Sequence, residues 1–487
     1  MSSTCTAETF VGDPRGWAEQ QFGQCELGDT RRTRRLVDYA ARQVAQPEAS
    51  TNAVCGGDDI VAEGTYRWLR NPAIDPKAVA EGPFGVTARL CDSCAVVLAI
   101  QDTTTVAYSH AVADTLGTVT EIEGHRVAGI LVHSTLMVDA QSREPLGLID
   151  QQRWSRPVAE VGSKTKRQKA TGKNKKRLYE EKESVKWEQA TERMCGRLES
   201  SDNVITVCDR EADIYEYLAY LIDKKHRFVV RSAQDRCLVT GKGHLFDMIA
   251  KQPVVGKRMV QISQRGLQRG TSKQKKRASR PARTSCMLVR AATVELARPA
   301  RCNEGPESIR VSVVYLRERH TPKGEEPAEW LLLTTESIAG RRQVERIVEY
   351  YECRWLIEEF HKAWKSGCRI EFRRLQSLGN LERMMAVTAT IAVRLLQIQA
   401  LAKLRSTDSC TPILNTSQWQ CLFAKMEPER PIPKRPPTIA WALEAIARLA
   451  GWRDTKRTGQ VGWQTLWSGW AKLEELTEGW NLAARRS

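Results

Sequence analysis

Residues 95–105 read AVVLAIQDTTT, and they decide the fold that the sequence predicts. The apolar run AVVLAI is short and continuous, which is typical of a β-strand buried on both faces of a sheet. A second run of this kind, VITVC at 204–208, is followed directly by Asp209, and the first leads into Asp102. Open α/β sheets place ligand-binding groups where such strands end. We therefore expect an α/β fold with both aspartates at one edge of the sheet.

Each acid also has an ordinary explanation. A lone aspartate at a strand end is commonly a turn former or a helix cap. Glu211 and Asp213 are nearby competitors for a functional role, but we expect them in the first turn of the following helix, where the helix dipole favours acids. The two strand-end aspartates need a third group before they indicate a site.

Charge narrows the class of partner. The chain of 487 residues holds 75 Lys and Arg against 58 Asp and Glu, a formal net charge of +17. The excess gathers in three runs, at 31–36, 163–177 and 269–283. One such run is ordinarily a solvated loop, but three in one basic chain favour a nucleic-acid partner. The first residues lack a signal-peptide pattern and no apolar run approaches a membrane span, so we expect a cytoplasmic protein without a membrane partner.

The third group is in YYECRWLIEEFHKAWK, residues 350–365, within a helix predicted from about 341 to 366. At 3.6 residues per turn, one narrow stripe of this helix carries Tyr351, Arg354, Glu358 and Lys365. The other face carries Trp355, Ile357 and Phe360, which are candidates for core packing. The stripe is compatible with a salt-bridged surface. Its cations also suit contact with a phosphate backbone. Its carboxylate can face the same phosphate only when a metal ion lies between the two groups.

Three carboxylates brought together by two strands and one helix would repel one another. They can hold two Mg²⁺ ions about 3.5–4 Å apart, which activate a water or a 3′-hydroxyl and stabilise the leaving oxygen. Mn²⁺ can substitute for Mg²⁺. Hard oxygen ligands suffice for such ions, so no His or Cys is required.

On these residues the sequence resembles the DDE transposases of bacterial insertion sequences, and among them the hairpin-forming, cut-and-paste Tn-five type. The motifs are IQDTTT at 100–105, VCDREADIYEYL at 207–218, and Tyr-x-x-Arg-x-x-x-Glu-x-x-x-x-x-x-Lys from 351 to 365. The likeness runs from LGDTRRTRRLV at 27–37 to IARLAGWRDTKRTG at 446–459. It implies an RNase H-like catalytic domain, a mixed sheet flanked by helices, at 76–402 with an all-β insertion at about 234–333. Helical domains are expected at 1–75, for transposon-end binding, and at 403–487, for dimerisation.

The resemblance also implies roles for single residues. Asp102, Asp209 and Glu358 form the catalytic, metal-binding triad. The DNA contacts near the cut are Tyr351, Arg354, Lys362, Lys365 and Arg231. Trp330 stacks in place of, or against, a base flipped out of the transposon end, although strand packing would also explain a tryptophan there.

The two end domains carry further implied contacts. The transposon end is bound by Arg31, Arg32, Arg35, Arg67 and Arg70, some of which are solvated charges. In the last helix, an apolar stripe consists of Trp463, Leu466, Trp467, Trp470 and Leu473. Such a stripe is ordinarily intramolecular core, and the resemblance favours a homodimer interface. The basic run 163–177 is longer than in the family, and either tracks DNA or is a solvated, disordered loop without DNA.

The expected function is cut-and-paste DNA transposition in the bacterial cytoplasm, at the nucleoid. The protein binds inverted-repeat ends, nicks them, cleaves through a hairpin and transfers the 3′-OH ends to target DNA. The alternatives are a non-catalytic DNA-binding regulator and a nuclease of the same fold. The sequence leaves open the terminal repeat, the target preference, the activity of this copy, a shorter inhibitor form, and which arginines read bases.

Overall fold

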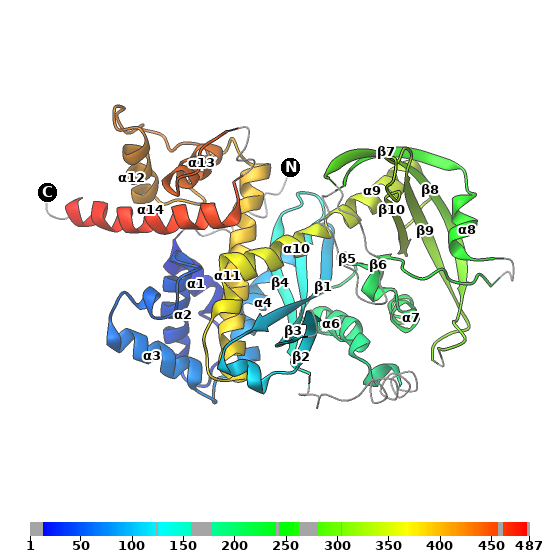
Figure 1. Ribbon diagram of the computed structural model, residues 1–487, viewed down its shortest axis with the longest axis horizontal. Helices are drawn as coiled ribbons and strands as arrows, with labels where there is room; N and C mark the ends of the chain where they lie inside the picture. Colours follow the sequence, from blue (N-terminus) through cyan, green and yellow to red (C-terminus); the bar gives the residue numbers. More distant parts are fainter. Residues whose placement is uncertain are drawn as a thin grey trace.

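A ten-stranded mixed sheet forms the centre of the protein in the computed structural model (Figure 1). The structure describes residues 13–122, 125–156, 178–239, 243–262, 281–302, 304–455 and 461–484. The first six strands are β1 (Val97–Tyr108), β2 (Thr118–Ile122), β3 (His125–Asp139), β4 (Pro145–Trp154), β5 (Val204–Cys208) and β6 (Arg227–Arg231). The last four are β7 (Val254–Ile262), β8 (Arg283–Ala297), β9 (Ser308–Glu318) and β10 (Glu329–Thr334).

The strand order is β2-β3-β1-β5-β6-β10-β9-β8-β7, with β4 paired to β3. The middle strands β1, β5 and β6 are parallel, and β3 and β4 add to them antiparallel. All five residues of β5 are buried, which explains why VITVC is apolar without alternation. This mixed sheet with helices on both faces is consistent with the RNase H-like expectation.

Strand β1 is longer than the sequence predicted. Its first half is buried, but it continues through Asp102 to Tyr108, paired with β3 over its full length. The parallel partner β5 ends opposite Gln101. Asp102 therefore does not end a strand; it stands where β1 loses its β5 neighbour. Threonines at 103–105 are good strand formers, and for that reason the strand extends beyond the apolar run.

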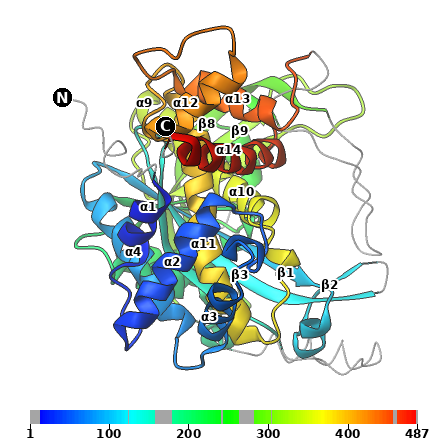
Figure 2. The same ribbon diagram turned by 90° about the vertical axis from the view of Figure 1, so that its left-hand side faces the viewer.

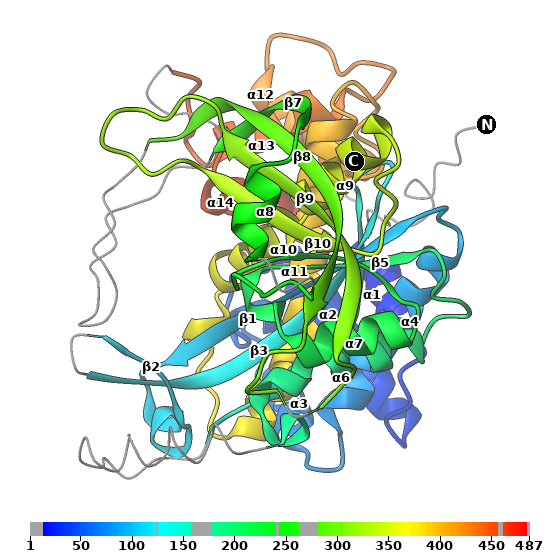
Figure 3. The same ribbon diagram turned by 90° about the vertical axis from the view of Figure 1, so that its right-hand side faces the viewer.

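The segment 234–333 is not all β, because helix α8 (Leu245–Ala250) lies within it. Strands β7, β8 and β9 continue the main sheet beyond β10, and α8 packs on β8 and β9 (Figure 3). The insertion is thus an extension of the central sheet.

The N-terminal part is helical, as expected. Its helices are α1 (Pro14–Phe22), α2 (Thr30–Ala45), α3 (Asp59–Arg70) and α4 (Pro76–Asp92). Asp29 caps α2 and Asp75 caps α4, whose first residue is a proline, the favoured N1 residue. Helices α1 and α4 pack together, and Figure 2 shows α1–α3 beside α11 (Leu378–Leu404).

The predicted helix 341–366 is three consecutive pieces: α9 (Arg341–Glu352), α10 (Trp355–Lys362) and a π-helical turn (Ala363–Gly367). Between α9 and α10 the N–H groups of Arg354 and Ile357 bond the carbonyls three residues earlier, which tightens the turn. Trp355 begins α10 and is 47% exposed, so its assignment to the core was wrong. Ile357 and Phe360 are buried.

Helix α11 is long and apolar enough to cross a membrane, contrary to the expectation that no apolar run approaches that length, but 83% of its most apolar window is buried inside the protein. Its buried residues include Met384, Val387, Ile391 and Leu395. It is therefore a core helix of the folded chain.

The C-terminal part holds α12 (Thr416–Met426), α13 (Ile439–Leu449) and α14 (Trp463–Ala484). Helix α14 packs on α12 and α13 and lies above the N-terminal helices (Figure 2). Four residues of its predicted interface stripe are buried within the chain: Leu466, Trp467, Trp470 and Leu473. Their assignment to a dimer interface is corrected, because the same apolar faces already pack against the protein's own core. The side chain of Trp463 lies outside the described residues.

The two faces of β1 meet different helices. Leu98 and Ile100 share a core with α10 and α11, whereas Val97 and Ala99 pack with Met194 of helix α6 (Lys186–Cys195). Because side chains alternate along a strand, Asp102 belongs to the α10 face and Thr103 to the α6 face. Helix α7 (Tyr215–Asp223) packs with α6, and Figure 1 shows both below β5 and β6, with α11 to the left of β1.

Candidate active site

Sheet register brings the first two acids together. Gln101 of β1 pairs with Cys208 of β5, so the next residues along, Asp102 and Asp209, stand side by side on neighbouring strands. Strands in a sheet lie about 4.8 Å apart. Val207 lies in the same core as α10, and alternation places Asp209 on that face as well. Its carboxylate accepts a hydrogen bond of 2.9 Å from the backbone N–H of Glu211.

Helix α10 covers these two aspartates. The imidazole Nδ1 of His361 lies 3.9 Å from Oδ2 of Asp102. Glu358 precedes His361 by three residues, so the two share one side of the helix. The helix thus carries the third carboxylate to the edge of the sheet where the two aspartates lie.

The pKa of Asp102 reflects burial and the charges of the other two acids. Burial raises the pKa of Asp102 to about 7; the charge of Asp209 and, more weakly, that of Glu358 act in the same direction, whereas Arg354 opposes them. The Asp102 carboxylate receives one backbone hydrogen bond, of 2.8 Å, from Thr103 N–H. Burial, with the charges of Lys365 and Arg354, lowers the pKa of His361 to about 3, so this histidine is neutral and does not balance the acids.

The donor set suits a hard divalent cation, because three carboxylates lie at one half-buried edge of the sheet. Arg354 forms an ion pair with Glu358. In this arrangement no three His, Cys, Asp or Glu side chains of the described ranges are close enough together to hold an ion.

An aromatic and basic cluster lies beside the acids. The rings of Trp330 and Tyr351 meet edge to face with centroids 5.3 Å apart. Burial raises the pKa of Tyr351, and the charges of Arg231 and Arg354 oppose this, which places both cations near its hydroxyl. Arg231 donates from Nη2 to the carbonyl of Glu329 at 2.7 Å. Strand β10, which carries Trp330, pairs with β6, which ends at Arg231.

Two family models match the chain. Residues 14–74 match the model described as transposase DNA-binding, and residues 182–394 match the transposase DDE domain. The chain carries the DNA-binding and DDE domains of a transposase. The DDE match includes Asp209 and Glu358, and Asp102, which precedes it, joins them through the pairing of β1 with β5. DNA is therefore a partner, and the DDE domain indicates a metal-dependent enzyme that cleaves DNA.

The predicted arginines of the transposase DNA-binding domain differ in their surroundings. Arg31 is exposed and paired with Asp29 at 2.9 Å, and Arg67 is exposed and paired with Glu63 at 3.1 Å. The exposed Arg70 stacks over Tyr66 at 5.4 Å. Arg32 instead donates to the carbonyls of Leu27 and Ala73, at 2.9 and 3.4 Å. Arg35 is half-buried, with its guanidinium against Gly64.

Within the DDE domain, two predicted cations of the α10 region also differ. Lys362 is exposed on α10. Lys365, in the π-helical turn, is half-buried and lies 3.9 Å from Glu371. The basic run 163–177 and most of the run 269–283 lie outside the described residues.

One competitor of Asp209 has a clear structural role. Asp213 precedes α7 instead of lying in its first turn, so its helix-dipole assignment was wrong. Its buried carboxylate accepts from Arg236 Nε at 3.1 Å and from the N–H groups of Ala233 and Gln234 at 2.7 and 2.8 Å. Asp213 thus fixes the chain that follows β6.

Sequence reasoning missed two residues of this edge. His361 lies against Asp102, and its buried Nε2 has no hydrogen-bond partner within the described part of the chain. Lys186, at the start of α6, lies 3.9 Å from Glu211. The spacing of His361 from Glu358, one helical turn, was a readable signal, whereas nothing in the sequence places Lys186 near Asp102.

Proposed function

We propose that this protein is a Mg²⁺-dependent DDE transposase that moves DNA by cut and paste. The observation that carries the proposal is the register that sets Asp102 beside Asp209 under the helix of Glu358. The raised pKa of Asp102, caused by burial and then by these two neighbours, supports a shared site. The two matched domains supply the class of reaction and of substrate.

Asp102, Asp209 and Glu358 are the residues that would hold two Mg²⁺ ions, or Mn²⁺ in their place. Such ions supply an activated oxygen nucleophile and stabilise the oxygen that leaves the phosphorus. The residues of this chain do the rest. Arg354 pairs with Glu358 in the metal-free protein. When the Glu358 carboxylate binds the ions, the Arg354 guanidinium would be free to bind a phosphate.

The aromatic and basic cluster would position the DNA strand at the acids. Arg231 lies at the Tyr351 hydroxyl, and Tyr351 faces the charge of Asp209, so their guanidinium and hydroxyl donors suit a phosphate there. Trp330 is only partly buried, and its ring would take the stacking role beside a flipped base. Lys362 and Lys365 would extend the contact along the backbone.

The proposed sequence of steps begins with attack of water on the phosphodiester at the transposon end, which leaves a 3′-OH. This 3′-OH attacks the opposite strand, forming a hairpin and releasing the flanking DNA. A second water reopens the hairpin, and the 3′-OH then attacks target DNA. The hairpin step rests on the Tn-five resemblance alone. Denaturing gels of the excision products test this step, because a hairpin runs as a strand of doubled length. Blunt ends that form without such a product would rule the hairpin step out.

The exposed arginines of the DNA-binding domain, Arg31, Arg67 and Arg70, are the proposed contacts to the inverted repeats. Arg35 would contribute from its half-buried position, while Arg32 would act by shaping the domain. We also propose a homodimer in the synaptic complex. On α14 the proposed dimer interface is no longer the buried stripe. It is the exposed far end of the helix, at Leu476, Trp480 and Leu482. The expected location remains the bacterial cytoplasm, at the nucleoid.

The direct test uses purified protein, Mg²⁺ and labelled DNA carrying the inverted repeats that flank its own gene. Wild-type protein should cut at the repeat boundary, and Glu358→Gln should bind the same DNA without cutting it. A matched control is Glu359→Gln, one residue further along the helix. Binding without cleavage by all three proteins would instead favour a DNA-binding regulator.

A further inference from the structure

Lys186 occupies an unusual position for a lysine. It is the first residue of α6, and its side chain is only 15% exposed. Its ammonium lies over the rings of Trp154 and Trp187, 5.7 and 5.5 Å from their centroids. Two indole faces hold a cation by electrostatic attraction without using any of its three N–H donors.

The donors of Lys186 have little to bind inside the protein. Nζ makes a long ion pair, 3.9 Å, with Glu211, whose side chain is 66% exposed. It makes no hydrogen bond to any residue of the described ranges. A lysine that is largely removed from water without hydrogen bonds is costly, and burial accordingly lowers its pKa, opposed by the charges of Glu211, Glu183 and Asp102. Glu211 is two residues after Asp209, and its backbone N–H donates to the Asp209 carboxylate, so this ion pair places the ammonium beside the candidate active site.

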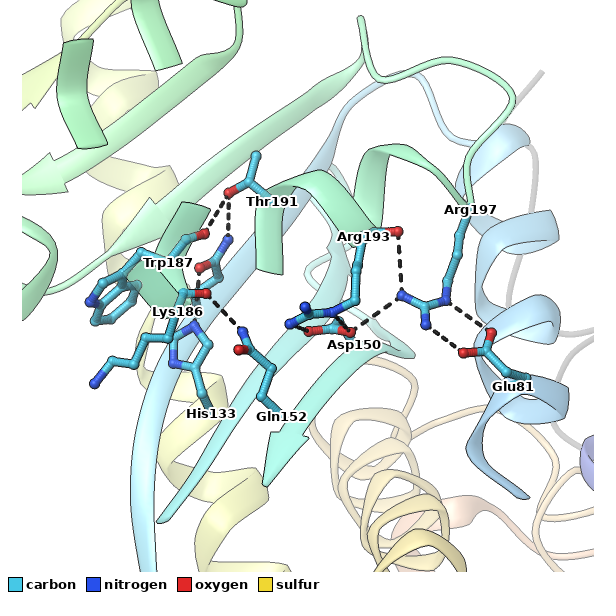
Figure 4. Close-up of polar contacts among 10 residues, drawn as sticks. Glu81, His133, Asp150, Gln152, Lys186, Trp187, Thr191, Arg193 and Arg197 are labelled. Atoms are coloured by element: carbon cyan, nitrogen blue, oxygen red, sulfur yellow. Dashed lines mark hydrogen bonds and ion pairs between the residues drawn. The ribbon is translucent and has the colours of Figure 1, made fainter. Parts of the chain in front are cut away.

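A buried polar chain fixes α6 against the strand of Asp102 (Figure 4). Thr103 is hydrogen-bonded to His133 Nδ1 at 2.9 Å, and His133 Nε2 lies 3.2 Å from Gln101 Oε1. The amide of Gln101 donates to Thr191 of α6 at 3.1 Å. Gln101, the residue before Asp102, therefore links α6 to this strand. Thr103, the residue after Asp102, joins the same chain through His133.

A second anchor acts on Lys186 directly. The Gln152 amide of β4 donates to the backbone carbonyl of Lys186 at 2.7 Å, and the Trp187 ring packs edge to face on His133 with centroids 4.6 Å apart (Figure 4). The lysine is therefore held from both ends, by its carbonyl and by the two rings around its ammonium. Such a fixed cation is poorly suited to be a mere solvated charge.

We propose that Lys186 binds a backbone phosphate of the DNA strand at the catalytic carboxylates, reaching it from the α6 face while Arg354 reaches the same strand from the α10 face. A phosphate oxygen would accept a hydrogen bond from the ammonium, and the indoles and the buried chain pre-set the position of the ammonium. This inference rests on the proposed function, because the ligand is the DNA that the transposase cuts.

The test is single-turnover cleavage of pre-bound end DNA in which one phosphate at a time, within three nucleotides of the cut, is a neutral methylphosphonate. One such substitution should slow the wild type about tenfold. Lys186→Gln should slow cleavage of ordinary DNA by a similar factor. On the DNA with the sensitive methylphosphonate, Lys186→Gln should cut no more slowly than the wild type, because both changes remove the same contact. Lys186→Arg should restore most of the rate, and Lys182→Gln, four residues earlier, is the control.

Three results would overturn the inference. One is a Lys186→Gln rate equal to that of Lys182→Gln. Another is a rate loss in Lys186→Gln that multiplies with the rate loss caused by the methylphosphonate at every position. The third is a Glu211→Gln protein with the same loss as Lys186→Gln, which would mean that the lysine only balances Glu211. Melting temperatures show whether Lys186→Gln is folded, and the Lys186→Arg protein carries the test if it is not. A wild type that does not cut its own ends would instead overturn the proposed function.

Discussion

Two aspartates of this protein, the buried Asp213 and the half-buried Asp102, have opposite surroundings. Asp213 has a guanidinium, two backbone N–H groups and the Ser232 hydroxyl around its carboxylate. Asp102 has one backbone N–H, a neutral histidine, two further carboxylates and, opposing them, the charge of Arg354. A buried carboxylate with every lone pair satisfied stabilises a fold, whereas one left in repulsion is a candidate for function. The difference separates the structural acids from the candidate catalytic ones.

The largest effect should come from removing the repelled acids. Asp102→Asn, Asp209→Asn and Glu358→Gln should each reduce cleavage of end DNA by at least about 1000-fold, because the charge that holds the catalytic cations is lost. DNA affinity should change little. Rates of strand nicking and gel-shift titrations measure the two quantities. A nearly wild-type nicking rate in any of the three would remove that residue from the triad.

Asp213→Asn should act on stability instead. It leaves Arg236, whose side chain is 5% exposed, without its anionic partner, and breaking such a buried pair costs about 3–5 kcal/mol. Thermal unfolding and soluble yield are the measurements, with Glu211→Gln as the exposed control. If Asp213→Asn has the melting temperature of the wild type, the claim that Asp213 stabilises the fold, unlike Asp102, is contradicted.

Asp102→Asn should stabilise the metal-free protein at high pH. The folded-state pKa is raised by burial and by neighbouring acids from 3.8 to about 7, so ionised Asp102 opposes folding. That cost is absent below the unfolded pKa, grows between pH 3.8 and about 7, and is complete above it. We expect a gain of roughly 1–3 kcal/mol at pH 8, shrinking by more than half at pH 5. Melting curves in EDTA at both pH values test this; equal gains would contradict it.

The smallest effects are expected in the DNA-binding domain. Arg67→Ala should weaken end binding about threefold to tenfold and lower the salt slope by about one, as for a single phosphate contact. Arg32→Ala should instead lower the melting temperature, since its guanidinium bonds two backbone carbonyls. Salt-dependent binding and melting curves of both variants distinguish a DNA contact from a stabilising residue. If Arg67→Ala lowered only the melting temperature and Arg32→Ala weakened only DNA binding, the two assignments would be reversed.

Strong local patterns predicted the two central strands, at 95–100 and 204–208, and proposed the acids beside them. VITVC ends at Asp209 as expected, but β1 passes through Asp102, because the threonines after it pair with β3. The burial of Trp467 and Trp470 depended on contacts with other helices, and periodicity shows that a face is apolar without showing what covers it. The partner of Asp213, Arg236, is on another element, and no local pattern pairs them.

The central claim is that Asp102, Asp209 and Glu358 together hold the divalent cations. Mn²⁺ binding to the protein–DNA complex, followed by electron paramagnetic resonance, tests it most directly. We predict saturable binding by the wild type and by Glu211→Gln, and its loss in Asp102→Asn, Asp209→Asn and Glu358→Gln. Equal Mn²⁺ binding by all five proteins would contradict the account.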